Sequence, residues 1–405
     1  MTSYTAPGTA PPPSHGGTSP VTAGGRDRYF DLLRALALFR VVLYHLVGWA
    51  WLPLVFPSMG VMFALAGSLM ARSLARPALR VIRSRVRRLL PPLWVLGAAA
   101  VTAMLVEGWR PGPSAVFWIL PLSDPPFLAA EWAGDMAEPL WYLRAYLWFV
   151  LLSPLLLRLL RRLPWLTLAA PVVLSFALAA GYLTMPERID SALTDFTTFG
   201  ACWILGMARH EGVLARLPRY IVPSLAPIVM LAGLWWAGQH GFSTGGELDG
   251  IPPADALWSL GAVMMLLHFS PSWDSWPPKL RQWDSVITLL NARAVTVYLW
   301  HNVCILLAAL LWDRMWDVDL LAEHASWLLD SWVPVLLIAW ALIAVCVLLF
   351  GWAEDLAARR RPRLWPNGQD TGKMETGLSH PARPAGESKV SHRSRAAIGP
   401  ETRRP

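Results

Sequence analysis

Three ionisable side chains, Asp31, Arg34 and His45, occur in one otherwise apolar stretch near the start of the chain. Arg34 and His45 are eleven residues apart. On a helix this spacing returns them to within about 20° of one face, roughly 16 Å apart along the axis. Asp31 precedes Arg34 by three residues, so the two can pair on the same stripe. A neutral imidazole here can act as a general base. The alternatives are a structural hydrogen bond for His45 and snorkelling of Arg34 to an interface.

Two arginines, Arg85 and Arg88, come just before another apolar stretch that begins near residue 89. Guanidinium groups bind phosphate bidentately, and the N-terminus of a helix adds its dipole. We therefore expect Arg85 and Arg88 to lie at a helix start and to bind phosphate. The alternative is an anchor that fixes the orientation of the chain in a membrane.

A later apolar stretch contains Tyr298 and His301, which lie one helical turn apart. His301 is a second candidate for chemistry, either by orienting an acceptor or by stabilising an oxyanion. For Tyr298 the alternative is ordinary helix packing.

The composition is that of a membrane protein. Of the 405 residues, 55% are hydrophobic and 15% are charged, whereas a soluble domain carries about 25% charged residues. The net charge of +8 comes from basic residues in loops and in the C-terminal tail, without the aromatic-interleaved basic domain of a nucleic-acid-binding protein. The three cysteines have no metal-ligand spacing and are too few for a disulfide framework. We predict no metal site.

The apolar stretches predict an all-α, polytopic fold with about ten transmembrane helices. They cover residues 31–51, 54–71, 89–107, 139–157, 165–184, 194–211, 220–239, 255–270, 292–312 and 327–352. Among the loops between the predicted spans, those after the second, fourth, sixth and eighth helices carry most of the arginines, including seven between residues 72 and 88. The positive-inside rule then predicts that both termini are cytoplasmic.

Three regions follow from this pattern. Residues 1–25 are rich in Pro, Gly, Ser and Thr and are expected to form a disordered tail. Residues 26–361 form the transmembrane domain, and residues 362–405 form a second disordered, basic tail.

Several motifs together resemble the type-3 integral-membrane acyltransferases, which include O-antigen and nodulation-factor O-acetylases. The matching residues are Asp31, Arg34 and His45; Gly60 to Gly67; Arg85, Arg88 and Pro91; Tyr298 to His301; and Trp352 to Asp355. The resemblance extends from residue 29 to about residue 360. One segment departs from the O-antigen type, because Tyr146 stands where that group has a glutamate.

The resemblance implies an acyltransferase that moves an acyl group, usually acetyl, from cytoplasmic acyl-CoA to a hydroxyl. The acceptor would be a cell-envelope glycan, a glycolipid or another small molecule, and the enzyme would reside in the inner (plasma) membrane. In this interpretation His45 is the catalytic base, His301 is the second candidate, and Arg34 supports the donor side. Arg85 and Arg88 bind the phosphates of CoA, and no cofactor is bound permanently.

Two other classes of function remain open on the sequence. A transporter would need a polar path through several helices, yet the acids inside apolar stretches lie mostly near their ends. A non-catalytic membrane sensor or scaffold would tolerate the loss of His45. The chain length of the acyl group, the acceptor, the side of its modification and the oligomeric state stay open as well.

Overall fold

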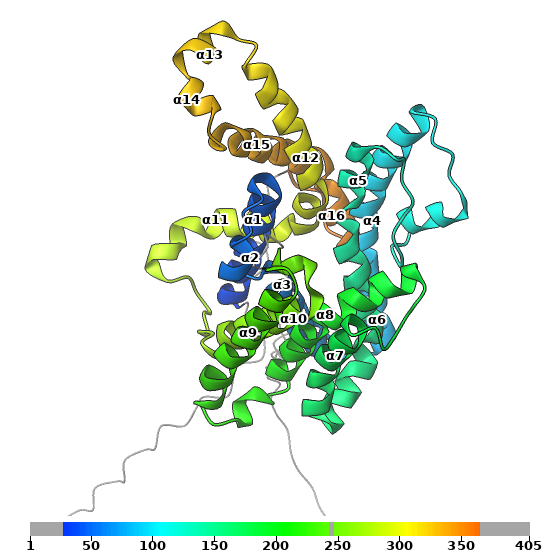
Figure 1. Cartoon of the computed structure of the whole chain (residues 1–405), viewed down its shortest axis with the longest axis vertical. Coiled ribbons are helices and arrows are strands. Elements are labelled where there is room, and N and C mark those ends of the chain that lie inside the picture. Colours follow the sequence, from blue (N-terminus) through cyan, green and yellow to red (C-terminus); the bar gives the residue numbers. More distant parts are fainter. Residues whose placement is uncertain (1–26, 243–246, 365–405) are drawn as a thin grey trace, which may run out of the picture. The chain divides into compact units, whose positions relative to one another are not determined.

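The computed structural model describes residues 27–242 and 247–364, and all regular secondary structure within them is helical (Figure 1). The all-α prediction is therefore confirmed for these residues. The tail predicted for residues 1–25 lies outside the described residues, as does the tail predicted for residues 362–405 beyond residue 364.

Sixteen α-helices are present in the described residues. They are α1 (Arg28–Val47), α2 (Leu52–Val55), α3 (Ser58–Ser73), α4 (Ala78–Val106), α5 (Glu131–Ala137), α6 (Leu140–Arg162), α7 (Pro164–Ala179), α8 (Glu187–His210), α9 (Ile221–Gln239), α10 (Pro252–His268), α11 (Asp284–Ala292), α12 (Ala294–Met315), α13 (Asp319–His324), α14 (Ser326–Leu329), α15 (Val333–Phe350) and α16 (Trp352–Ala357). Short 3₁₀ turns cover Pro113–Trp118, Leu214–Arg216, Leu248–Gly250 and Pro278–Trp283.

Each predicted span has a helical counterpart, but within residues 27–242 and 247–364 six helical segments are long and apolar enough to cross a membrane. These are Leu52–Ser73, Ala78–Val106, Glu131–Arg162, Ile221–Gln239, Ala294–Met315 and Val333–Phe350. Helices α7 and α10 have 16 and 17 residues, which is short for a span. Helices α1 and α8 are longer but carry several charged residues. The chain is a multi-pass membrane protein, and the count of ten spans is not confirmed.

Helix α4 begins eleven residues earlier than the sequence pattern predicted, at Ala78 rather than residue 89. Arginine is a good helix former, so the Arg-rich segment continues the apolar helix toward its N-terminus instead of forming a loop. Arg85 is therefore the eighth residue of α4, well past the first turn. The predicted contribution of the helix dipole at Arg85 and Arg88 is wrong, because that effect fades within one turn.

Two glycines allow α3 and α8 to pack with their backbones in contact. A Cβ atom added at Gly67 would collide with the carbonyl oxygen of Trp203, and one at Gly206 would collide with that of Ala64. Small residues at such crossings are typical of membrane helix pairs. Next to this crossing Phe63 packs in an aromatic cluster with α6 and α8. The crossing and the cluster hold the polar residues of α3, α6 and α8 in fixed positions.

Helix α16 is tied to the start of α12 by polar contacts. The buried Arg293 donates from Nη2 to Asp355 Oδ2 at 2.7 Å and from Nη1 to the carbonyl oxygen of Gly351 at 2.8 Å. The backbone N–H of Thr296 donates to Glu354 Oε1 at 2.7 Å. These bonds position the C-terminal end of the described chain beside α4 and α12.

Candidate active site

A cavity of about 420 Å³ is lined by four arginines from two helices and the segment after α16, and we call it the arginine cavity. The arginines are Arg34 of α1, Arg85 and Arg88 of α4, and Arg360, which follows α16. Part of the cavity wall is aromatic and is formed by Tyr142, Tyr146 and Tyr298. The structure therefore brings together the three arginines that the sequence singled out, and it adds Arg360.

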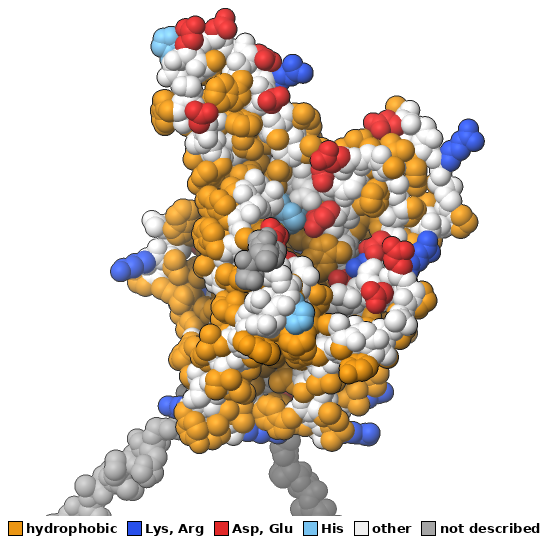
Figure 2. All heavy atoms as spheres, in the orientation of Figure 1, with side chains coloured by type: hydrophobic (Ala, Val, Ile, Leu, Met, Phe, Trp, Pro, Cys, Tyr) orange, Lys and Arg blue, Asp and Glu red, His pale blue; other side chains and the backbone are white. Residues whose placement is uncertain are grey.

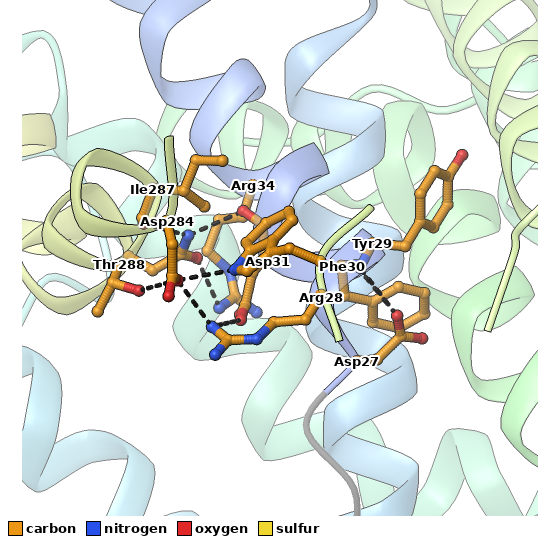
Figure 3. A network of polar contacts seen from close by, with 11 residues as sticks. Asp27, Arg28, Tyr29, Phe30, Asp31, Arg34, Asp284, Ile287 and Thr288 are labelled. Atoms are coloured by element: carbon orange, nitrogen blue, oxygen red, sulfur yellow. Dashed lines mark hydrogen bonds and ion pairs between the residues drawn. The ribbon is translucent and has the colours of Figure 1, made fainter. Parts of the chain in front are cut away.

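Arg34 is held by a network at the start of α1 (Figure 3). Its Nη1 donates to Asn291 Oδ1 at 3.2 Å, and Asn291 Nδ2 donates to the backbone carbonyl of Asp31 at 2.8 Å. The Asp31 carboxylate lies 3.8 Å from Arg28, whose guanidinium also donates to Asp284 at 3.2 Å. Asn291 thus links Arg34 to Asp31, and α11 fixes the orientation of the guanidinium.

A second cavity, of about 350 Å³, is lined by His45, and we call it the histidine cavity. Its wall also includes four carboxylates, from Glu138, Asp195, Asp249 and Asp255. Figure 2 shows acidic side chains around a hollow in one face of the molecule. Arg34 does not line this cavity. Arg34 and His45 were predicted to share one face of α1, but they line two different cavities.

His45 lies in a polar cluster that joins α1, α12 and Glu138, which follows α5. Its Nε2 is 4.0 Å from Glu138 Oε1, and its ring centroid is 4.9 Å from that of His301. Glu138 in turn accepts a hydrogen bond of 2.9 Å from Asn302 Nδ2 through its other oxygen. A carboxylate held at this distance stabilises the imidazolium that forms when His45 takes a proton.

The two histidines differ in their access to the cavity. His45 is 29% exposed through its side chain, whereas His301 is fully buried and does not line the cavity. His301 Nδ1 is 2.5 Å from the carbonyl oxygen of Tyr298. A carbonyl only accepts, so Nδ1 carries the proton and Nε2 of neutral His301 keeps its lone pair. This Nε2 is buried without a hydrogen-bond partner among the described residues. His301 can position His45, but it does not reach the cavity.

Tyr298 lines both cavities. The histidine cavity is built from the C-terminal end of α1 and the N-terminal end of α3, with residues such as Tyr44 and Ser58. The arginine cavity uses the opposite ends of the same helices, with residues such as Arg34 and Leu69. The two cavities therefore lie toward opposite ends of the helices and meet at Tyr298, which is 4% exposed.

Sequence reasoning missed Glu138, Asn302 and Arg40 as site residues. Glu138 directly precedes the span predicted over residues 139–157, and Asn302 directly follows His301, where a polar residue inside an apolar helix could have indicated a role. Arg40 lines the histidine cavity with its guanidinium 4.7 Å from the Tyr44 ring centroid. Asp249, in the turn before α10, lines the same cavity, and burial raises its pKa.

The wall of the histidine cavity opposite α1 is fixed by a buried arginine. Arg144 of α6 is 4% exposed and donates to Asp195 Oδ2 at 2.6 Å; it also pairs with Asp124. The span predicted over residues 194–211 places Asp195 at a helix start, but α8 begins at Glu187, so Asp195 lies in the helix interior. A buried ion pair is stable only when both partners are held in good geometry, so Arg144 and Asp195 keep α6 and α8 in register.

Comparison with known proteins gives one match. A family model described as an acyltransferase domain matches residues 27–351. No curated protein and no solved structure matches the chain. The matched range contains every residue that lines the histidine cavity. It also contains all residues of the arginine cavity except Glu354, Asp355, Ala358 and Arg360.

Proposed function

Because the chain belongs to the type-3 acyltransferase family, we propose that this membrane enzyme transfers an acyl group from acyl-CoA in the arginine cavity to a hydroxyl in the histidine cavity. The acyl group is acetyl in the simplest case. The acceptor is a glycan, a glycolipid or another small molecule of the cell envelope. The observation that carries the proposal is that Tyr298 lines both cavities, one lined by four arginines and two carboxylates and the other containing His45.

The arginine cavity supports a phosphate-containing donor. Arg34, Arg85, Arg88 and Arg360 line it together, and paired guanidinium groups are the usual ligands for phosphate in proteins. Its volume of about 420 Å³ lies in the range of small-molecule sites. A thioester on a flexible arm would enter between these arginines and reach toward Tyr298.

The histidine cavity supports activation of a hydroxyl. In the proposed step, His45 takes the hydroxyl proton while the oxygen forms a bond to the thioester carbonyl carbon. The carbon–sulfur bond then breaks, and the leaving sulfur receives the proton from His45. Glu138 stabilises the imidazolium between these two events, and His301 positions the ring of His45.

The proposed orientation places the arginine cavity and both termini in the cytoplasm, with the protein in the inner (plasma) membrane. The charge distribution supports it. On the face in Figure 2, basic side chains line the lower edge, and the acidic side chains lie higher, together with a few further basic ones. In a variant without native cysteines, a cysteine at Arg80 should be protected from an impermeant thiol reagent, and one at Glu323 should be labelled. External labelling at position 80 would reverse the orientation.

The test of the function is acyl-CoA turnover by purified protein in nanodiscs, with envelope glycans and lipids as acceptors. General-base catalysis contributes about 10²–10⁴-fold, so His45→Ala and His45→Gln should lose activity by that order. His324→Gln is the matched control, because His324 is exposed at the end of α13.

The result also separates the other classes of function. If His45→Gln keeps most of the wild-type rate, the imidazole is structural and the proposed base is wrong. If the wild-type protein releases no CoA with any acceptor, the proposed donor is wrong. A solute that crosses the membrane in an unmodified form would instead indicate a transporter.

A further inference from the structure

A third cavity lies beside the arginine cavity, and we call it the seven-arginine pocket. It has a volume of about 480 Å³, and seven of its ten lining residues are arginines. They are Arg76, Arg80, Arg83, Arg85, Arg87, Arg88 and Arg359. No acidic residue lines it, and no ion pair joins any of these arginines to a carboxylate among the residues that the structure describes.

The pocket is built from segments far apart in the chain. Ser73 at the end of α3 accepts a hydrogen bond of 3.0 Å from Arg85 of α4. Arg87 Nε donates to the carbonyl oxygen of Ala357 in α16 at 3.4 Å. Arg359 adopts a φ of 57°, a backbone conformation that costs free energy for a residue other than glycine. A charge anchor for membrane orientation needs positive charge but no such convergence, so the arrangement indicates a ligand.

Arg85 and Arg88 line both the seven-arginine pocket and the arginine cavity. A ligand held by both residues could therefore extend from one space into the other. Coenzyme A has the required layout, with a nucleotide that carries a 3′-phosphate, a diphosphate in the middle and a thioester arm at the far end.

We propose that the seven-arginine pocket binds the 3′-phosphate end of the donor, with Arg85 and Arg88 at the diphosphate and the pantetheine arm in the arginine cavity. This inference rests on the proposed function. A phosphate monoester carries about −1.5 to −2 charges at pH 7, and the pocket offers positive charge with no internal counter-ion. The donor is then a complete CoA thioester. An acyl group on a protein-bound phosphopantetheine arm, which lacks the nucleotide, is excluded.

An anionic lipid headgroup is the other source of the same phosphate chemistry. The lining argues against it, because Val81 is the one apolar residue among the ten and gives no groove for acyl chains. The experiment must nevertheless separate the two sources.

The test compares acetyl-CoA with acetyl-3′-dephospho-CoA, which differs only in the missing phosphate. A charge-assisted contact of this kind is worth about 10- to 100-fold in affinity, so wild-type kcat/KM should fall by that factor with the dephospho donor. The double variant Arg76→Gln/Arg80→Gln should abolish the discrimination and keep kcat at saturating donor. The matched control Arg158→Gln/Arg162→Gln removes two arginines of α6 that line none of the three cavities, and it should discriminate like the wild type.

Each outcome has a separate meaning. If the wild type uses both donors equally while His45→Ala is inactive, the proposed function holds and the pocket assignment is overturned. Binding of adenosine 3′,5′-bisphosphate gives an independent check, and it should be lost in Arg76→Gln/Arg80→Gln. If this variant instead loses thermal stability only in phosphatidylglycerol nanodiscs, with unchanged donor discrimination, the pocket binds lipid and the proposal fails.

Discussion

Replacing Glu138 by glutamine would test whether its carboxylate assists His45. The substitution removes the negative charge 4.0 Å from His45 Nε2 and keeps an oxygen that can accept the hydrogen bond from Asn302. The shape of the cavity is conserved, so a change in rate reports the charge.

The expected magnitude follows from the distance and the exposure. Opposite unit charges at 4 Å attract by about 1 kcal/mol in water and about 4 kcal/mol at an effective dielectric constant near 20. The side chains of His45 and Glu138 are 29% and 39% exposed, so the lower part of this range applies. A loss of about 1–2 kcal/mol of transition-state stabilisation corresponds to a decrease in kcat of about 5- to 30-fold.

The assay is a double-mutant cycle on CoA release, with Glu138→Gln, His45→Ala and the double variant. If Glu138 acts through His45, adding Glu138→Gln to His45→Ala should change the remaining rate by less than about 2-fold. Glu131→Gln is the control, because Glu131 is an exposed acid of α5 outside the histidine cavity. An equal loss from Glu138→Gln in both backgrounds would refute the coupling, as would an unchanged rate in the single variant.

Three further predictions concern packing, pH and the donor. Gly67→Ala should lower the free energy of unfolding by about 1–3 kcal/mol and reduce the melting temperature, whereas Gly112→Ala, whose added Cβ meets no atom within 4 Å, should not. The bonds of 2.7 and 3.0 Å from Arg161 lower the pKa of Glu211, and a depressed pKa stabilises the fold above the unfolded pKa. Arg161→Gln should therefore lower the melting temperature slightly at pH 7, and the difference from wild type should be lost as the pH falls through the lowered pKa of Glu211. Arg34→Lys keeps the positive charge but loses the planar guanidinium that binds phosphate through two hydrogen bonds. Its KM for the donor should therefore lie between those of the wild type and Arg34→Ala.

The sequence predicted the helices well because long apolar stretches have few other stable forms in a membrane. It misplaced the start of α4, since a run of arginines has the composition of a loop but a high helix propensity. Its count of ten spans is not confirmed, because helices such as α1 continue the helical pattern but carry several charged residues. Helical periodicity reports which side of a helix is apolar, and it does not show whether that helix is exposed to lipid.

The site was predictable only where its residues share one helix or one short motif. The spacing of Arg34 and His45 placed them on one stripe, but it could not show that Tyr298 from another helix separates their cavities. Glu138 lies far from His45 in the sequence, and their approach depends on how α5, α6 and α12 pack. Such long-range contacts leave no periodic pattern in a single sequence.

The position of Tyr298 between the cavities has a consequence for the kinetics of the proposed reaction. Because donor and acceptor would occupy separate spaces that meet only at this side chain, neither has to leave before the other binds. A ternary complex can therefore form in either order. Free CoA would compete with the donor for the arginines, while an excess of acceptor would not relieve that inhibition.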